Sequence, residues 1–96
     1  MDDPVTIDHF SPLVGKTVRL QGAPVALVID RVEAGQPGPP ELRQPFTVLF
    51  RGPRSAPVAP EGLYVCEIED ADRFELYIMP IHTPDPGRQD YQAVFN

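Results

Sequence analysis

Pro45-Phe46-Thr47-Val48-Leu49-Phe50-Arg51-Gly52-Pro53 is the stretch of sequence that decides the fold. Phe46, Val48 and Phe50 alternate with Thr47, Leu49 and Arg51, and this period of two residues is typical of a β-strand with one buried face. The closing Gly-Pro pair is a common strand terminator, so we expect the strand to end at Arg51.

The same alternation recurs along the chain, with turn residues between the repeats. Consecutive short strands with tight or medium connections predict an all-β fold, a small antiparallel six-stranded barrel or sandwich with meander order. A short N-terminal helical turn precedes the strands, because Pro12 suits a first helical turn and Gly15 can end one. The predicted strands cover residues 17–21, 25–33, 46–51, 63–69, 73–81 and 91–95.

The 96 residues are enough for one domain, residues 1–96, with residues 1–7 as a flexible N-terminal tail. The 13 prolines cluster in the joints between apolar segments, which favours stiff turns over a disordered linker. The single cysteine, Cys66, excludes an intramolecular disulfide and lies on the apolar face of its strand, where a buried thiol is the expected role.

The chain carries a net charge of -6, which argues against two classes of partner. Nucleic acid and anionic membranes repel such a surface, and a close basic pair such as Arg51 and Arg54 is too little to form a basic patch. We therefore expect no nucleic-acid partner and no membrane partner. The acidic start Met1-Asp2-Asp3-Pro4 lacks the features of a signal peptide, so the expected location is cytoplasmic.

The second face of the predicted sheet is less polar than the outside of a monomeric barrel should be. Leu49, Met79 and Val94 are candidates for an exposed apolar interface. This excess predicts self-association or a protein partner, unless the two proline-rich loops cover it. The apolar residues of this face are Leu49, Leu63, Val65, Tyr77, Met79, Ile81 and Val94.

Phe50, Arg51, Gly52 and Pro53 form the most distinctive local motif. An arginine fixed at a strand end can hold a carboxylate or phosphate, which would make a ligand site. A cross-strand ion pair with an acidic residue of a neighbouring strand is the more economical use, and we name Glu67, Glu69 and Glu75 as its candidates.

Catalytic, metal and cofactor sites have little support in the sequence. The acidic hairpin at 67–75 displays its carboxylates in a row rather than around a cation, so we expect a solvated face and no metal. His82 and Asp85 could act as a base and its orienting partner, yet no activated nucleophile accompanies them. We therefore expect no cofactor and no enzymatic activity.

The order of these features resembles a family of small bacterial domains of unknown function with a Phe-Arg-Gly-Pro signature. The resemblance spans nearly the whole chain and rests on residues 10–15, 45–53, 61–64, 77–81 and 91–96. Genes of this family often lie beside genes for phage-tail-collar-like proteins, so the resemblance implies a part in a tail-like particle. It implies no catalytic residues.

Three functional hypotheses follow. The first is a structural, assembly or protein-interaction domain that presents its apolar and acidic face to itself or to a tail-like protein. The second is a monomeric binding module that uses the turn at Arg51 for a small anionic or sugar ligand. The third, which we rank last, is a hydrolase-type enzyme that uses His82.

Overall fold

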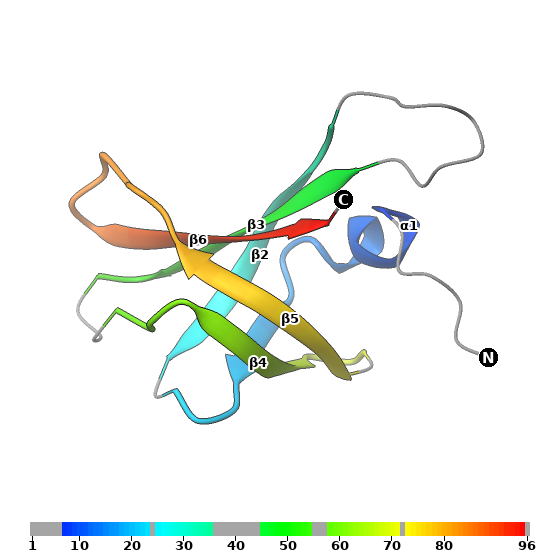
Figure 1. Cartoon of the computed structure of the whole chain (residues 1–96), viewed down its shortest axis with the longest axis horizontal. Coiled ribbons are helices and arrows are strands. Elements are labelled where there is room, and N and C mark those ends of the chain that lie inside the picture. Colours follow the sequence, from blue (N-terminus) through cyan, green and yellow to red (C-terminus); the bar gives the residue numbers. More distant parts are fainter. Residues whose placement is uncertain (1–6, 24, 36–44, 55–57, 72, 96) are drawn as a thin grey trace.

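The chain forms a closed antiparallel β-barrel of six strands, preceded by a short helical segment (Figure 1). The structure is a computed structural model that describes residues 7–23, 25–35, 45–54, 58–71 and 73–95. The predicted fold class is thereby confirmed as a barrel rather than a sandwich. The elements are α1 (Ile7–Phe10), the 3₁₀ turn η1 (Ser11–Leu13), β1 (Thr17–Leu20), β2 (Ala26–Ala34), β3 (Phe46–Pro53), β4 (Gly62–Ile68), β5 (Arg73–Pro80) and β6 (Arg88–Phe95).

The strand order around the barrel is β1-β2-β3-β6-β5-β4, and not the meander that we predicted. Each half of the chain is a three-stranded meander, β1-β2-β3 and β4-β5-β6. The two halves close the barrel through antiparallel pairing of β1 with β4 and of β3 with β6. Alternation along one strand fixes which side chains face inward but does not say which strand lies beside it, so the prediction of strand order was wrong.

The predicted end of the third strand was also wrong. β3 continues through Gly52 and Pro53, which pair with Gln89 and Arg88 of β6. β6 accordingly begins at Arg88, earlier than the predicted residue 91. A proline can end a ladder without a break in the strand, because it lacks only the donor.

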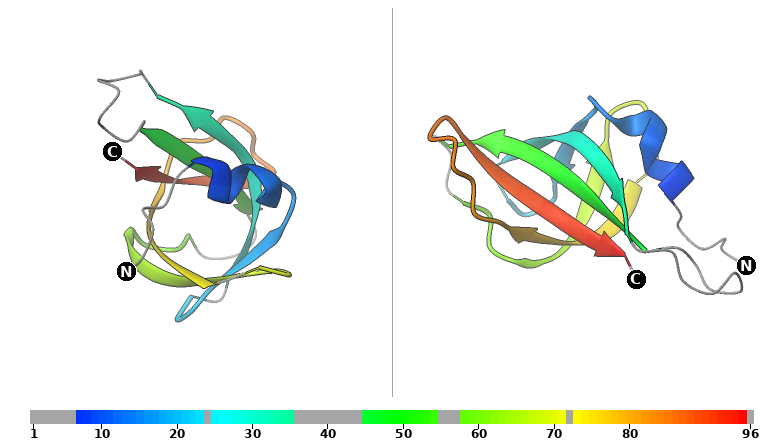
Figure 2. Two further views of the ribbon diagram at one scale, coloured as in Figure 1. Left: turned by 90° about the vertical axis from the view of Figure 1, so that its right-hand side faces the viewer. Right: turned by 90° about the horizontal axis from the view of Figure 1, so that it is seen from above.

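The interior of the barrel contains the three residues that alternation placed on the buried face of the third strand, Phe46, Val48 and Phe50. Helix α1 lies at one end of the barrel (Figure 2), where Phe10 is fully buried. Its ring centroid lies 6.0 Å from that of Phe46, 5.2 Å from that of Phe74 and 5.5 Å from that of Phe95. The buried apolar residues are Phe10, Val18, Leu20, Val25, Leu27, Ile29, Phe46, Val48, Phe50, Ala59, Cys66, Ile68, Leu76, Ile78, Tyr91 and Ala93.

A β-bulge interrupts β2 at Asp30. Ile29 pairs with Phe50 and Arg31 pairs with Leu49, so Asp30 is an extra residue without a partner of its own in the ladder. A bulge of this kind places two successive side chains on nearly the same side of the sheet. Asp30 and Arg31 can therefore both face outward, and alternation resumes after them with Val32 opposite Val48.

The tight connections agree with the predicted turns. The amide of Ala23 donates to the carbonyl oxygen of Leu20, and the amide of Ala71 donates to that of Ile68. Gly15, the residue expected to end the helical turn, has a φ of 93°. Outside the described residues lie Pro24, Asp72, residues 36–44 and residues 1–6 of the predicted tail. Ile7, which we included in that tail, instead begins α1 and packs against the core.

Candidate functional site

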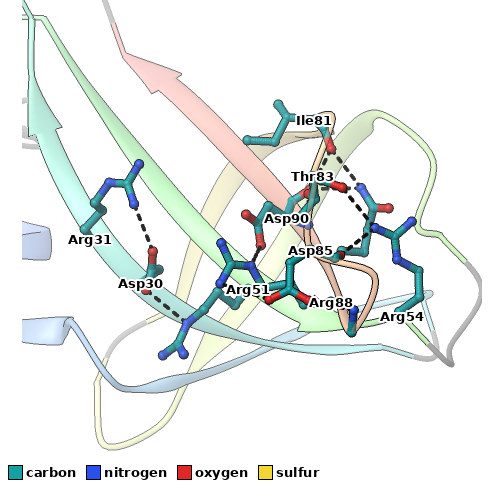
Figure 3. A network of polar contacts seen from close by, with 11 residues as sticks. Asp30, Arg31, Arg51, Arg54, Ile81, Thr83, Asp85, Arg88 and Asp90 are labelled. Carbon is teal, nitrogen blue, oxygen red and sulfur yellow. Dashed lines mark hydrogen bonds and ion pairs between the residues drawn. The ribbon is translucent and has the colours of Figure 1, made fainter.

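Arg51, the most distinctive candidate of the sequence, takes part in an ion pair on the outer face of β2 and β3 (Figure 3). Its Nε lies 3.0 Å from Oδ1 of Asp30, the residue that the bulge turns outward. We expected an ion pair with Glu67, Glu69 or Glu75, and that choice of partner was wrong. β3 is flanked by β2 and β6, so the side chains of β4 and β5 do not adjoin Arg51.

The neighbouring Arg31 extends this charged cluster along β2. Its Nε lies 2.8 Å from a carboxylate oxygen of Glu33, and its Nη1 lies 3.3 Å from Oδ2 of Asp30. The hydrogen bond and the charge of Glu33, with the charges of Asp30 and Asp90, raise the pKa of the Arg31 guanidinium. Charges of opposite sign therefore alternate on this face of the barrel.

The cluster continues on β6 with Asp90, which pairs with Arg51 across the strands. Nε of Arg88 lies 3.0 Å from Oδ1 of Asp90, and both atoms are buried. The contact is an ion pair without hydrogen-bond geometry, so within the described ranges neither atom has a hydrogen-bond partner. Nη1 of Arg88 also lies 3.9 Å from the carboxylate of Asp85.

Arg54 connects this cluster to the loop between β5 and β6. Its Nη2 donates to the carbonyl oxygen of Thr83 at 3.2 Å and to that of Asp85 at 3.1 Å. The hydroxyl of Thr83 in turn accepts a hydrogen bond from the amide of Asp90 at 2.8 Å. Arg54 thus provides hydrogen-bond partners for backbone carbonyl groups of the loop, which is a structural role.

The charged cluster has acids and bases in near balance, and Arg51 already has a carboxylate beside it. A ligand carboxylate or phosphate would have to displace Asp30. An open depression of about 370 Å³ lies elsewhere, lined by Thr17, Arg19, Glu67, Ile68 and Glu69. Arg51 does not line it, so the geometry favours a structural role for this arginine.

We expect Arg51→Ala to lower the free energy of unfolding by less than about 1 kcal/mol. The ion pair with Asp30 is partly exposed, with 46% of the arginine side chain accessible, and exposed pairs contribute little. Urea unfolding of Arg51→Ala, of Asp30→Ala and of the double variant measures the coupling energy between Arg51 and Asp30. A loss above about 2 kcal/mol would show that Arg51 does more than this ion pair.

Phe50 and Gly52, the other alternating half of the motif, face the interior. Both are buried, and Gly52 packs against Leu27 and Tyr91. The hydroxyl oxygen of Tyr91 accepts a hydrogen bond of 3.0 Å from the amide of Ala59, which fixes the segment before β4 to the barrel. The Phe-Arg-Gly-Pro motif thus combines two inward positions with two exposed ones, Arg51 and Pro53.

The candidate apolar interface lies on the outer surface as predicted, but its members differ in exposure. Leu49 and Met79 both pair with Gln92 and are half-buried, whereas Val94 is 44% exposed. Leu63 and Tyr77 are more exposed, at 61% and 47%, and pair directly across β4 and β5. We call Leu49, Leu63, Tyr77, Met79 and Val94 the outer apolar band.

Tyr77 has a polar contact at the edge of this band. Its hydroxyl donates to a carboxylate oxygen of Glu61. That hydrogen bond, followed by partial desolvation and the charge of Glu61, raises the pKa of Tyr77. The ring is therefore held in place on the surface, which reduces the entropy that a docking partner would have to remove.

The residues considered for catalysis are dispersed. His82 is exposed in the loop between β5 and β6, and the carboxylate of Asp85 accepts a hydrogen bond of 2.8 Å from the amide of Gly87. The hydroxyl of Ser11 donates to the carbonyl oxygen of Ile7 at 3.1 Å. Ser55 lies outside the described residues. Within the described part of the chain, no three His, Cys, Asp or Glu side chains are grouped to hold a metal ion.

Cys66 is fully buried, as predicted, and burial raises the pKa of its thiol to about 11. Its Sγ lies 3.7 Å from the carbonyl oxygen of Tyr64. A thiolate would lose hydration in this interior without gaining a cation, so the thiol is a poor nucleophile at neutral pH.

We expect the free energy of unfolding to fall as the pH rises from about 9 to about 11. The unfolded thiol ionises near its ordinary pKa of 9.0, whereas the native thiol keeps its proton to about 11. In that window the native state binds more protons, so alkali favours unfolding. Urea unfolding of the natural chain and of Cys66→Ala should show a steeper alkaline decline for the natural chain, and equal slopes would contradict the assignment.

Comparison with known families assigns the chain to one of them. A family model described as a domain of unknown function, DUF6916, matches residues 5–95, and the chain belongs to this family. No curated protein and no solved structure matches the chain. No helix in the described part of the chain is long and apolar enough to cross a membrane.

Proposed function

We propose that this domain acts by contact with another protein chain and not by catalysis. The observation that carries the proposal is the outer apolar band, which lies on β3, β4, β5 and β6 outside a barrel whose interior is already filled. Large exposed apolar side chains gathered on adjacent strands are typical of interaction surfaces. Leu63 and Tyr77, directly opposite each other, are the most exposed members.

The alternatives from the sequence have weaker support. The small-ligand module requires Arg51 to be free for an anion, and its guanidinium instead lies beside Asp30. The hydrolase requires a nucleophile near His82, and the thiol of Cys66 is buried. A place in a phage-tail-like particle belongs to the proposal as an extension, supported by the gene neighbourhoods that the resemblance implies.

Light scattering of the purified chain, across a dilution of about a hundredfold, tests the proposal with a second copy as the first partner. A mass that rises with concentration, and that Leu63→Asp returns to the monomer value, supports docking through the band. Val14→Asp is the matched control, because Val14 is 47% exposed and lies before β1, outside the band. Association that both variants leave intact would reject the band as the interface.

A mass equal to the monomer at every concentration would exclude self-assembly in this range. It would direct the proposal to a different protein chain. If the natural chain does not self-associate and is as soluble as the Leu63→Asp variant, that result would argue against any interface on the band.

A further inference from the structure

The seam between β5 and β6 is the least paired part of the barrel. Among the described residues the two strands pair only at Met79 with Gln92 and at Pro80 with Tyr91. β3 and β6, in contrast, pair along their whole lengths from Phe46–Phe95 to Pro53–Arg88. In Figure 1 the end of the yellow β5 lies beside the beginning of β6, and the two strands diverge toward the red C-terminal end of β6.

The backbone of β5 directs hydrogen-bonding groups into this seam. The carbonyl oxygen of Val65 accepts a hydrogen bond from the amide of Gln21. The backbone amide and carbonyl of Val65 therefore point toward β1, and those of the residues on either side of it point toward β5. Glu75 is opposite Val65 in the ladder, and backbone direction alternates along an antiparallel strand. The amide and carbonyl groups of Glu75 and Tyr77 therefore point away from β4, toward the side of β6.

The same alternation can be followed from the other end of the strand. The amide of Ile81 donates to the carbonyl oxygen of Asp90 at 3.1 Å, in register with the pairing of Met79 and Gln92. Glu75 and Tyr77 belong to the same odd-numbered series as Ile81. In the part of the chain that the structure describes, they have no ladder partner on that side.

The side chains around the seam are of two kinds. On the inside, the ring of Phe10 lies between those of Phe74 and Phe95, so the core is closed although the strand edge is not. On the outside, Tyr77 and Val94 of the outer apolar band lie on the two strands that flank the seam. A chain entering here would meet aromatic rings inward and apolar side chains outward.

The charge beside the seam is negative in the part of the chain that the structure describes. Glu75 is exposed and has no ion-pair partner among the described residues, whereas the next outward residue, Arg73, lies 3.7 Å from Glu67. The whole chain carries a net charge of -6. A second copy would add the same negative charge, while a basic segment would offset it.

We propose that the free edge of β5 receives an extended basic segment of a partner protein as an additional β-strand. The inference rests on the proposed function and names its partner class. Unpaired backbone groups favour an extended chain over a helix or a small molecule. The rings of Phe74 and Phe95 call for apolar side chains at every second position, and Glu75 calls for Lys or Arg at the positions between.

A synthetic peptide, acetyl-Lys-Val-Thr-Val-Lys-Val-Thr-amide, is the probe, and NMR of the isotope-labelled full chain is the readout. Before peptide is added, the amides of Glu75 and Tyr77 should exchange with solvent much faster than that of Leu76, which faces β4. With peptide, their signals and that of Val94 should shift, and their exchange should slow. Protected amides in the free monomer would overturn the inference.

Charge reversal tests the chemistry of the partner. Glu75→Lys should weaken binding of the lysine peptide by about fivefold or more, as expected for loss of a cross-strand charge pair. The same peptide with Glu in place of Lys should bind this variant better than the natural chain. Glu75→Gln is the matched control, and its affinity for the lysine peptide should lie between those of the natural chain and of Glu75→Lys. Identical affinities of all three chains would overturn the basic character of the segment.

Alternate N-methylation of the peptide tests strand pairing itself. Methyl groups on one set of alternate residues should abolish binding, because those amides face β5, and methyl groups on the other set should be tolerated on that edge. Binding that is insensitive to both patterns, or shifts confined to another face, would overturn the inference. Neither result affects the interface test with Leu63→Asp.

A third outcome separates the two proposals. If the peptide does not bind and the chain dimerises with protected amides at Glu75 and Tyr77, the occupant is a second copy. The proposed function then stands and this inference fails. If Leu63→Asp changes nothing while the peptide binds at the seam, strand addition stands and the outer apolar band fails as the interface.

Discussion

Phe10→Ala should lower the free energy of unfolding by about 3–5 kcal/mol, the range for loss of a buried phenylalanine. The side chain is fully buried and its ring contacts three other phenylalanine rings, on β3, β5 and β6. A domain typically has about 5–15 kcal/mol of total stability, so this loss would remove a large fraction of it. Urea unfolding followed by circular dichroism measures the change.

Two controls make this prediction specific. Phe10→Leu keeps most of the apolar volume and should cost clearly less, since it loses mainly the aromatic contacts. Val14→Ala, in the exposed residue after η1, should change the stability by no more than about 0.5 kcal/mol. A cost below about 1 kcal/mol for Phe10→Ala would mean that α1 does not close the end of the barrel in solution.

Gly52→Ala should be destabilising by about 1–3 kcal/mol, and Gly52→Val by more, because both overfill a packed interior. A Cβ at this position would lie 2.7 Å from Cδ2 of Leu27 and 3.2 Å from Cε1 of Tyr91. Leu27 is fully buried and Tyr91 is 1% exposed, so neither can move away without disturbing its neighbours. Thermal or urea unfolding of both variants measures the effect.

A matched glycine and a double-variant cycle test the steric cause. Gly62→Ala places its Cβ no closer than 3.9 Å to Tyr64, so this strand glycine should tolerate the change within about 0.5 kcal/mol. In the Gly52→Ala background, Leu27→Ala should cost less than it does in the natural chain, because it removes the clashing methyl group. Additive effects would show that the clash with Leu27 is not the cause.

Alternation in the sequence was sufficient to predict part of the core of this barrel, but not Leu27 and Ile29, which lie in a run that is apolar on both faces. Phe46, Val48 and Phe50 are buried and Arg51 is exposed, because a strand with one solvated face repeats every two residues. The Gly-Pro pair after them was misinterpreted as a turn. Gly52 lies where a Cβ would clash with Leu27 and Tyr91, which only the tertiary packing reveals.

Two features that shape the candidate site depend on how strands meet. The bulge at Asp30 leaves no clear signal, because the residues before it are apolar on both faces of the strand, yet it supplies the carboxylate beside Arg51. The seam at Glu75 depends on strand order and on the direction of backbone groups. Neither is encoded in the hydrophobic pattern of one strand.

The exposure of the outer apolar residues was only partly predictable. Alternation placed Leu49, Met79 and Val94 outside, but could not rank their exposure, which neighbouring side chains decide. Leu63 and Tyr77 belonged to the same outer set and proved more exposed, because β4 and β5 bring them together with no element over them among the described residues. Relative exposure across strands requires the register of the sheet.

The division of the barrel into two meanders has a consequence for the folding pathway. Each meander can form from local contacts, whereas the ladders β1–β4 and β3–β6 join residues far apart in the chain, such as Val18 with Ile68. Loop-closure entropy opposes such distant pairing, so docking of the halves should be the slow step. Until it occurs, the uncharged edge Tyr91–Phe95 of β6 lacks its partner strand from the first half of the chain, and an edge of this kind can pair with other nascent chains.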